Sequence, residues 1–206
     1  MPITIETVSC GMIQENAYIV AAEGRDDCVV IDPGDEYPKL RRAIGGRRVG
    51  AILLTHGHFD HTMAVAPMAE AFGAPVYVGE RDIVMLNDAS LNGYADLMGR
   101  ETMDAPEITA QPLDDALSAC GLRFTVLRTP GHSMGSTCLY LADEGVLFSG
   151  DTLFRMGYGR MDLYGGNTAD MIRSLKALFA LPGETRVCPG HGEATTIGAE
   201  RARYRL

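Results

Sequence analysis

The chain has 206 residues, of which 46% are apolar and 22% are charged, and its formal net charge is −9. This length suits a single domain with a sizeable core, so we expect one domain over residues 1–206. The negative charge argues against nucleic acid or an anionic membrane surface as a partner, and no apolar run is long enough to span a bilayer.

Residues 1–6 read as the start of a strand rather than as a signal peptide, because they contain no basic segment and no long apolar segment. The five cysteines are widely spaced and form no C-x-x-C pair. Such spacing is typical of free thiols in a reducing compartment, so we expect a cytoplasmic protein. The sequence leaves its oligomeric state open.

Short apolar runs separated by turn signals predict alternating strands and helices in the first half of the chain. The predicted strands are residues 3–8, 18–21, 28–31, 49–54 and 75–78. The predicted helices are residues 37–44, 63–72 and 80–86. The span 87–110 is the least regular stretch, and a loop of that length in a compact domain usually serves as a lid or a binding segment.

The second half of the chain repeats the order of the first half: strand, turn, strand, aspartate, helix. The first copy comprises 18–21, 28–31, Asp32 and 37–44, and the second comprises 137–141, 146–148, Asp151 and 169–180. This repeat predicts an α/β fold of two facing sheets with outer helices, an αββα sandwich. It makes Asp32 the counterpart of Asp151, and we expect Asp32 to accept a hydrogen bond from a metal-binding histidine. A turn-capping role for Asp32 is the alternative.

All five histidines follow short apolar runs at predicted strand exits. Three of them lie with Asp60 in the segment T-H-G-H-F-D-H at residues 55–61. A single histidine at a surface is common, but five at strand exits predict a shared metal site. One tetrahedral ion takes four ligands at most, so this many donors favour two adjacent ions. The candidate ligands are His56, His58, Asp60, His61, His132, Asp151 and His191.

The segment T-H-G-H-F-D-H resembles the hallmark T-H-x-H-x-D-H of the metallo-β-lactamase superfamily, and the resemblance extends over nearly the whole chain. Three further segments are similar to the short glyoxalase II-like hydrolases: G-D-T-L-F at 150–154, G-R-M-D at 159–162 and P-G-H-G at 189–192. The resemblance implies the four-layer fold of that superfamily, with two facing mixed sheets. We expect the chain to be without the C-terminal helical domain of full-length glyoxalase II.

The resemblance also implies a division of the candidate ligands between two divalent ions. His56, His58 and His132 would hold one ion, Asp60, His61 and His191 would hold the other, and Asp151 would bridge them. Zn²⁺ is the first expectation for both ions, with iron or manganese as alternatives. Asp60 and Asp151 are in addition the predicted catalytic residues.

Two adjacent cations can share one hydroxide as the nucleophile, because metal binding lowers the pKa of water from about 15.7 to roughly 7. The motif regions offer no spare acid to protonate a leaving group. This favours a thioester over an amide, because a thiol has a pKa of about 8.5 and its thiolate can depart unprotonated. The resemblance to glyoxalase II implies the hydrolysis of S-D-lactoylglutathione to D-lactate and glutathione.

One segment departs from the glyoxalase II pattern. Full-length enzymes have G-x-G-K-F-Y, whose lysine and tyrosine contact glutathione, whereas this chain has G-Y-G-R-M-D at 157–162. Arg160 retains the cation and could bind a carboxylate with two hydrogen bonds, and Tyr158 is the second predicted substrate-binding residue. Asp162 replaces the tyrosine, which counts against full glutathione recognition. A local ion pair between Arg160 and Asp162 is the alternative role for this arginine.

Other functions remain open at this point. The pattern G-R-x-D also occurs in persulfide dioxygenases of the same fold, which use one iron held by the residues that match His56, His132 and Asp151. Iron content and oxygen consumption would distinguish such an enzyme from a hydrolase. Hydrolysis of another ester or a lactone, or metal binding without catalysis, are further alternatives. Flavodiiron proteins have glutamate where this chain has His58, which argues against that group.

Overall fold

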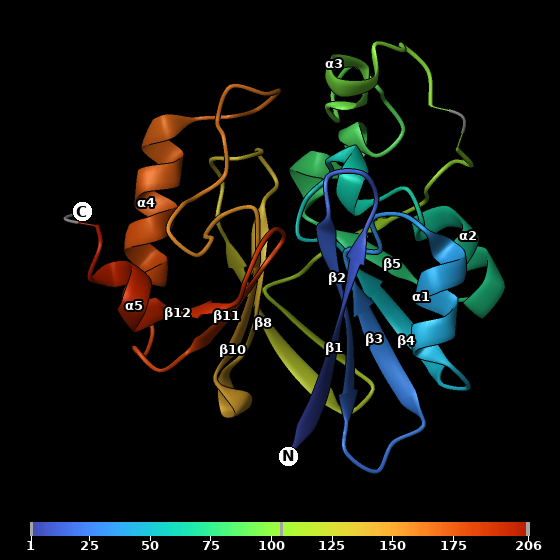
Figure 1. Cartoon of the computed structure of the whole chain (residues 1–206), viewed down its shortest axis with the longest axis horizontal. Helices are drawn as coiled ribbons and strands as arrows, with labels where there is room; N and C mark the ends of the chain where they lie inside the picture. The colour runs from blue at the N-terminus through green and yellow to red at the C-terminus, as the bar shows by residue number, and fades with distance from the viewer. Residues whose placement is uncertain (1, 104, 205–206) are drawn as a thin grey trace.

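Two six-stranded sheets pack face to face, and helices cover the outer face of each sheet (Figure 1). This computed structural model describes residues 2–103 and 105–204. The arrangement confirms the αββα sandwich that the repeated order of elements predicts.

The first sheet has the strand order β1-β2-β3-β4-β5-β6. The pairs β1–β2 and β2–β3 are antiparallel, and the pairs from β3 to β6 are parallel. These strands are β1 (Ile3–Cys10), β2 (Glu15–Ala22), β3 (Asp27–Ile31), β4 (Arg48–Leu53), β5 (Val76–Val78) and β6 (Gln111–Pro112).

The second sheet has the order β12-β11-β10-β9-β8-β7, in which only β10 and β11 pair in parallel. Its strands are β7 (Ala116–Ala119), β8 (Leu122–Arg128), β9 (Thr137–Leu141), β10 (Val146–Gly150), β11 (Arg186–Pro189) and β12 (Thr195–Thr196). The helices are α1 (Tyr37–Ile44), α2 (Val65–Phe72), α3 (Tyr94–Met98), α4 (Thr168–Leu178) and α5 (Ile197–Arg201). Short 3-10 helices span Phe59–His61, Glu80–Met85 and Ala142–Glu144.

Three apolar cores hold the four layers together, and the central strands contribute to two of them. Because successive side chains of a strand point to opposite faces, Ile19 of β2 packs toward α1 and α2 while Val20 packs toward the second sheet. Because β2 and β3 are buried on both faces, they are apolar along almost their whole length. The third core lies between the second sheet and the helices α4 and α5.

The helix predicted at 63–72 begins two residues later, at Val65. Pro67 explains the difference, because a proline has no backbone N–H and is tolerated only in the first turn of a helix. A start at Met63 would have placed Pro67 beyond that turn. The predicted helix at 80–86 forms a 3-10 helix instead. Within the described residues, no helix is long and apolar enough to cross a membrane.

Candidate metal centre

The loops at one edge of the two sheets bring all seven predicted ligands together. His56 and His58 follow β4, and Asp60 and His61 lie in the short helix after them. The other three come from the second sheet, one after each of three strands: His132 follows β8, Asp151 follows β10 and His191 follows β11. Since the carboxyl ends of parallel strands meet at one edge, the strand topology itself gathers these side chains.

The donor atoms form overlapping groups in which all atoms lie within 4.8 Å of one another. One group consists of His56, His58 and His132. Nδ1 of His58 lies 2.8 Å from Nε2 of His132, so two ring nitrogens face each other inside the protein. This geometry suits two imidazoles that share a cation.

A second group consists of Asp60, His61 and His191. Oδ2 of Asp60 lies 3.1 Å from Nε2 of His191 and 3.4 Å from Nε2 of His61. The carboxylate of Asp151 lies between the two groups: Oδ1 is 3.4 Å from Nε2 of His61, and Oδ2 is 3.6 Å from Nε2 of His132. Asp151 is therefore the candidate for the bridging role that the family resemblance implies.

Several buried atoms of this cluster have no hydrogen-bond partner, among them Nε2 of His56, Nε2 of His61 and Oδ1 of Asp151. A buried polar atom without a partner is costly, and most such atoms in folded proteins are paired. Divalent cations coordinated by these atoms would remove that cost. The donor set of imidazole nitrogens and carboxylate oxygens fits zinc, iron or manganese.

The electrostatics favour the protonation states that metal ligands need at His56, His58 and Asp151, whereas His61 would have to lose a proton. Burial lowers the pKa of His56 well below its usual range and that of His58 to about 3, so both imidazoles are neutral. Burial alone would raise the pKa of Asp151, but the neighbouring His61 lowers it below its usual range. Burial alone would lower the pKa of His61, but the carboxylates of Asp60 and Asp151 raise it well above its usual range. A cation at this position would replace the proton on His61.

Hydrogen bonds fix which ring nitrogen faces the cluster. Asp32 accepts from Nδ1 of His61 at 3.1 Å and from both the backbone N–H and the hydroxyl of Thr55 at 2.7 Å. Because the Thr55 hydroxyl donates to Asp32, its oxygen is free to accept from Nδ1 of His56 at 3.0 Å. Nδ1 of His132 donates to the carbonyl of Arg160 at 2.7 Å. In each case Nε2 remains available for a metal ion.

Asp82 is a buried residue of this site that carries no sequence signal. Its carboxylate accepts from the backbone N–H of Gly57 at 3.0 Å, from that of Gly135 at 2.6 Å and from the hydroxyl of Ser133 at 2.5 Å. Gly57 lies between His56 and His58, whereas Ser133 follows His132. Asp82 therefore ties together the two loops that supply the first group of ligands.

Strand β2 holds the loop of His191 in a similar way. The side-chain amide of Asn16 donates to the carbonyls of Pro189 and Gly192, and the hydroxyl of Tyr18 donates to the carbonyl of Pro189 at 2.7 Å. Gly190 is required in this loop, because a Cβ there would overlap the side chains of Asp151 and His61.

The carboxylate of Glu15 is also fully buried, 3.7 Å from Nδ1 of His61, and burial raises the pKa of Glu15 well above its usual range.

A cavity of about 610 Å³ opens over the cluster. Arg160 lines it, as predicted, and its guanidinium donates two hydrogen bonds of 2.7 Å to the carboxylate of Asp162. The irregular span 87–110 contributes Asn92, Gly93, Asp96 and Leu97. Tyr158 does not line this cavity, because its ring lies against that of Tyr204, with centroids 5.9 Å apart.

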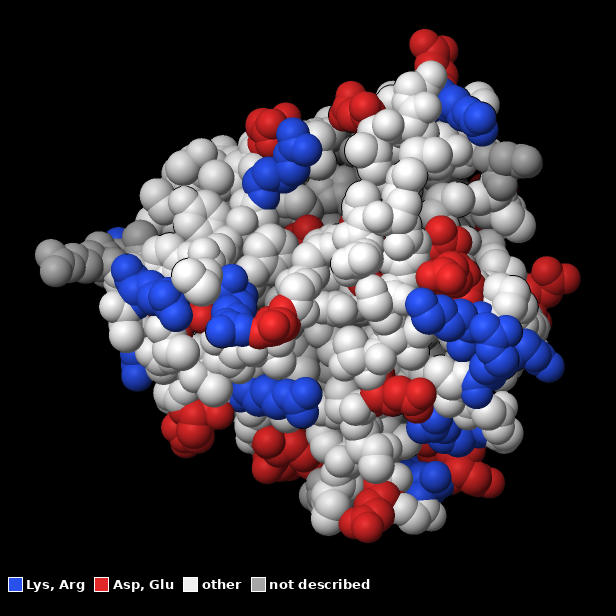
Figure 2. Space-filling view, in the orientation of Figure 1, with Lys and Arg blue, Asp and Glu red and all other residues white. Residues whose placement is uncertain are grey.

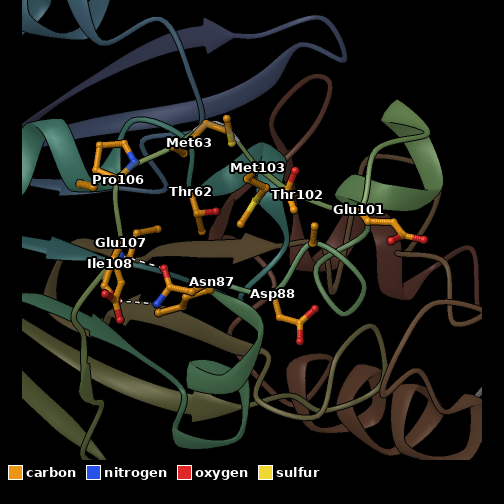
Figure 3. A pocket seen from close by; sticks show the side chains of 14 residues that line it. Thr62, Met63, Asn87, Asp88, Glu101, Thr102, Met103, Pro106, Glu107 and Ile108 are labelled. Carbon is orange, nitrogen blue, oxygen red and sulfur yellow. Dashed lines mark hydrogen bonds between the residues drawn. The ribbon is translucent and has the colours of Figure 1, made fainter.

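The span 87–110 encloses a separate cavity of about 400 Å³ against the start of α2 (Figure 3). The side-chain amide of Asn87 closes this loop, since it both donates to the carbonyl and accepts from the N–H of Ile108. None of the seven candidate ligands lines this second cavity. It therefore lies apart from the metal centre.

Comparisons with known proteins agree with this geometry. A family model described as the metallo-beta-lactamase superfamily matches residues 10–191. A probable metallo-hydrolase, YqgX of Bacillus subtilis, is 39% identical over 93% of this chain and 91% of that protein. A hydroxyacylglutathione hydrolase of Ectopseudomonas mendocina is 36% identical over 80% of this chain, but the match covers only 56% of that protein.

Solved structures share this fold over nearly the whole chain. The BLEG-1 B3 metallo-beta-lactamase has a TM-score of 0.90 and 37% identity, covering 97% of both chains. TTHA1623, solved in a di-iron-bound form, has a TM-score of 0.84 and 43% identity, covering 95% of this chain and 96% of the other. ETHE1 from Myxococcus xanthus is more distant, with a TM-score of 0.75 and 25% identity over 96% of this chain and 81% of the other.

Proposed function

Because this chain belongs to the metallo-β-lactamase superfamily and is a metallo-hydrolase, we propose that it cleaves a small thioester with the help of two divalent metal ions. S-D-lactoylglutathione is the first substrate to test. The observation that carries the proposal is the convergence of seven donors in two groups around Asp151, beneath an open cavity lined by Arg160. The similarity to a hydroxyacylglutathione hydrolase supports the choice of a thioester.

The reaction adds water to a carbonyl carbon. The oxygen of water forms a bond to that carbon, the carbon–sulfur bond breaks, and the sulfur leaves with the bonding electron pair as a thiolate. When bound, divalent ions would supply a water acidified to a pKa of roughly 7 and would polarise the carbonyl oxygen. The carboxylates of Asp60 and Asp151 lie where they would hold those ions and accept a hydrogen bond from the attacking water.

The cavity is poor in groups that could protonate a leaving group. Among its described lining residues there is no lysine, tyrosine or cysteine, and its three histidines, His58, His132 and His191, are all candidate metal ligands. The hydrogen bond from Arg160 lowers the pKa of Asp162 to about 2, so that carboxylate does not donate a proton at neutral pH. A thiolate can leave without a proton, whereas an amine needs either a proton or a cation to stabilise the departing nitrogen. The chemistry of the cavity therefore favours a thioester over an amide.

Two experiments test the proposal together. Metal analysis of the purified protein establishes whether ions are present, and a panel of thioesters, with the released thiol measured by a colorimetric reagent, establishes the reaction. A second candidate substrate is a β-lactam, because a B3 metallo-beta-lactamase has the same fold at 37% identity. Cleavage of β-lactams without thioester cleavage would replace the proposal, and oxygen consumption with glutathione persulfide would indicate an iron dioxygenase instead.

We expect about two metal ions per chain, because seven donors exceed what one tetrahedral ion can accept. His191→Ala should reduce the content to about one, since it removes a donor from the second group only. Elemental analysis by mass spectrometry of the dialysed protein would measure both values. Zn²⁺ is the first expectation, and iron is the alternative that a di-iron form of TTHA1623 suggests. An unchanged metal content in His191→Ala would show that this residue is not a ligand.

Arg160→Ala should raise the KM for a glutathione thioester about tenfold and leave kcat within about twofold, because a charge-assisted hydrogen bond contributes about 1.5–3 kcal/mol. A contact remote from the scissile bond contributes equally in the ground state and the transition state, so KM rather than kcat should change. Asp162→Ala is the matched control, because it breaks the same ion pair but leaves the cation in the cavity. An equal effect of both variants would mean that the pair only fixes the loop.

A further inference from the structure

A mainly apolar cavity of about 300 Å³ adjoins the metal centre. It shares Ile13, Phe59 and Asp60 with the cavity over the cluster, so the two spaces adjoin each other at a candidate metal ligand. The turn between β1 and β2 forms one wall and α3 forms the opposite wall. The other residues of this side pocket are Cys10, Gly11, Met12, Gly34, Asp35, Met63, Tyr94 and Met98.

The rim of the side pocket exposes large apolar side chains to solvent. Met12 is 71% exposed, Ile13 is 40% exposed and Met98 is 37% exposed. Figure 2 shows that the surface over the β1–β2 turn is white, with charged side chains around it rather than on it. A cluster of exposed apolar side chains beside a cavity typically marks a binding site for an apolar group.

The distribution of charge distinguishes the two spaces. The described lining of the side pocket includes the carboxylates of Asp35 and Asp60 but no lysine or arginine. An anionic carrier such as glutathione would meet the carboxylate of Asp35 there and no side-chain cation. The cation Arg160 lies in the cavity over the cluster instead. A polar thiol carrier is therefore favoured on the side of Arg160, and an apolar group is favoured between the β1–β2 turn and α3.

We propose that this side pocket is an acyl subsite that takes the apolar acyl chain of the thioester. The proposal rests on the proposed function and narrows its substrate class to thioesters with a medium-length aliphatic acyl group. If each methylene needs roughly the volume of a water molecule, about 30 Å³, a cavity of about 300 Å³ accepts a hexanoyl chain with room to spare. The scissile carbonyl would then lie beside Asp60.

The separate cavity of about 400 Å³ fits this role less well. Met63 lines both spaces, but that cavity has three carboxylates in its wall and no candidate metal ligand (Figure 3). The carboxylates belong to Asp88, Glu101 and Glu107.

A series of thioesters of one thiol, from acetyl to hexanoyl, tests the proposal. Each methylene that enters the pocket should raise kcat/KM by up to about fourfold, so hexanoyl, with four more methylenes than acetyl, should exceed it by between about tenfold and about 250-fold. Met98→Gln should lower kcat/KM for the hexanoyl thioester about tenfold by placing an amide against the chain, and should leave the acetyl thioester within about twofold. Met98→Leu should restore the preference.

Ile172→Gln is the matched control, because Ile172 is 38% exposed on α4 and lines neither space. It should leave both substrates unchanged. Thioester cleavage without a preference for chain length, or an equal loss for both substrates in Met98→Gln, would overturn the acyl subsite while leaving the thioesterase function intact.

Binding gives a readout that does not depend on turnover. In protein with ¹³C-labelled methionine methyl groups, hexanoate should shift the signals of Met12, Met63 and Met98, whereas acetate should not. Met134 and Met171 serve as internal controls, since neither lines the side pocket. If no thioester is cleaved, the proposed function fails, and these shifts alone decide whether the pocket binds an aliphatic chain. Hexanoate that shifts none of the three signals would refute the inference in either case.

Discussion

Asp151→Asn is expected to lower kcat for the best thioester by about a hundredfold to a thousandfold. This is the range found when a single group that stabilises transition-state charge is removed. The carboxylate of Asp151 is the only one near both donor groups among the described residues: it approaches His61 through one oxygen and His132 through the other. An asparagine offers one neutral oxygen, and its NH₂ group would face one set of imidazoles. Both the charge and the bridge would be lost.

Steady-state kinetics and metal analysis of the same preparation would measure this effect. Asp143→Asn is the control, because Asp143 follows β9 on an exposed turn and the substitution removes the same charge from the surface. We expect Asp143→Asn to retain full activity. A variant of Asp151 that kept more than about a tenth of the activity with unchanged metal content would exclude the bridging role, since the loss of a metal-site contact typically costs 10–100-fold.

The convergence of the candidate ligands could be predicted because their donors are dense in the sequence. Four of them fall within residues 56–61, and each of the remaining three follows an apolar run that ends in a tight turn. A strand carries its exit residue to a sheet edge whatever the details of packing. The prediction therefore needed only the positions of β4, β8, β10 and β11, not their tertiary contacts.

The internal repeat of the chain predicted the position of Asp32. The repeat places Asp32 after β3 as Asp151 lies after β10, and the structure places its carboxylate against Nδ1 of His61. The alternative role, a cap of its own turn, is not what its hydrogen bonds show, since Asp32 accepts from Thr55 and His61, which lie 23 and 29 positions away. Its φ of 47° is a left-handed conformation that aspartate tolerates better than most residues.

The supporting residues could not be predicted, because their partners are distant in the sequence. Asp82 contacts residues 51 and 53 positions away, and Asn16 contacts residues more than 170 positions away. No feature of the neighbouring sequence distinguishes Asp82 from the exposed acidic residues around it. Tyr158 shows the opposite problem: its neighbours in the sequence suggested a place in the cavity, but its ring lies against Tyr204. Sequence proximity to Arg160 does not determine the direction of a side chain in a loop.

Asp82→Asn should lower the affinity for the metal ion of the first group about 10–100-fold, although Asp82 touches no candidate ligand side chain. Oδ1 of Asp82 accepts from Gly135, and Oδ2 accepts from Gly57 and Ser133. An amide places its NH₂ group against a backbone N–H in either orientation, so at least one buried donor loses its partner. That loss costs about 1–3 kcal/mol, which corresponds to a melting temperature lower by about 2–12 °C.

Metal titration well below the melting temperature separates positioning from stability. If Asp82 positions His58 and His132, the folded variant should bind Zn²⁺ more weakly, and excess Zn²⁺ should restore most of the activity. Glu80→Gln is the control, because it removes one charge from an exposed position of the same 3-10 helix. A lower melting temperature with unchanged metal affinity would assign Asp82 to the fold alone. The weaker affinity is expected because His58 and His132 come from different sheets, and within the described residues Asp82 is the side chain that binds the loops of both.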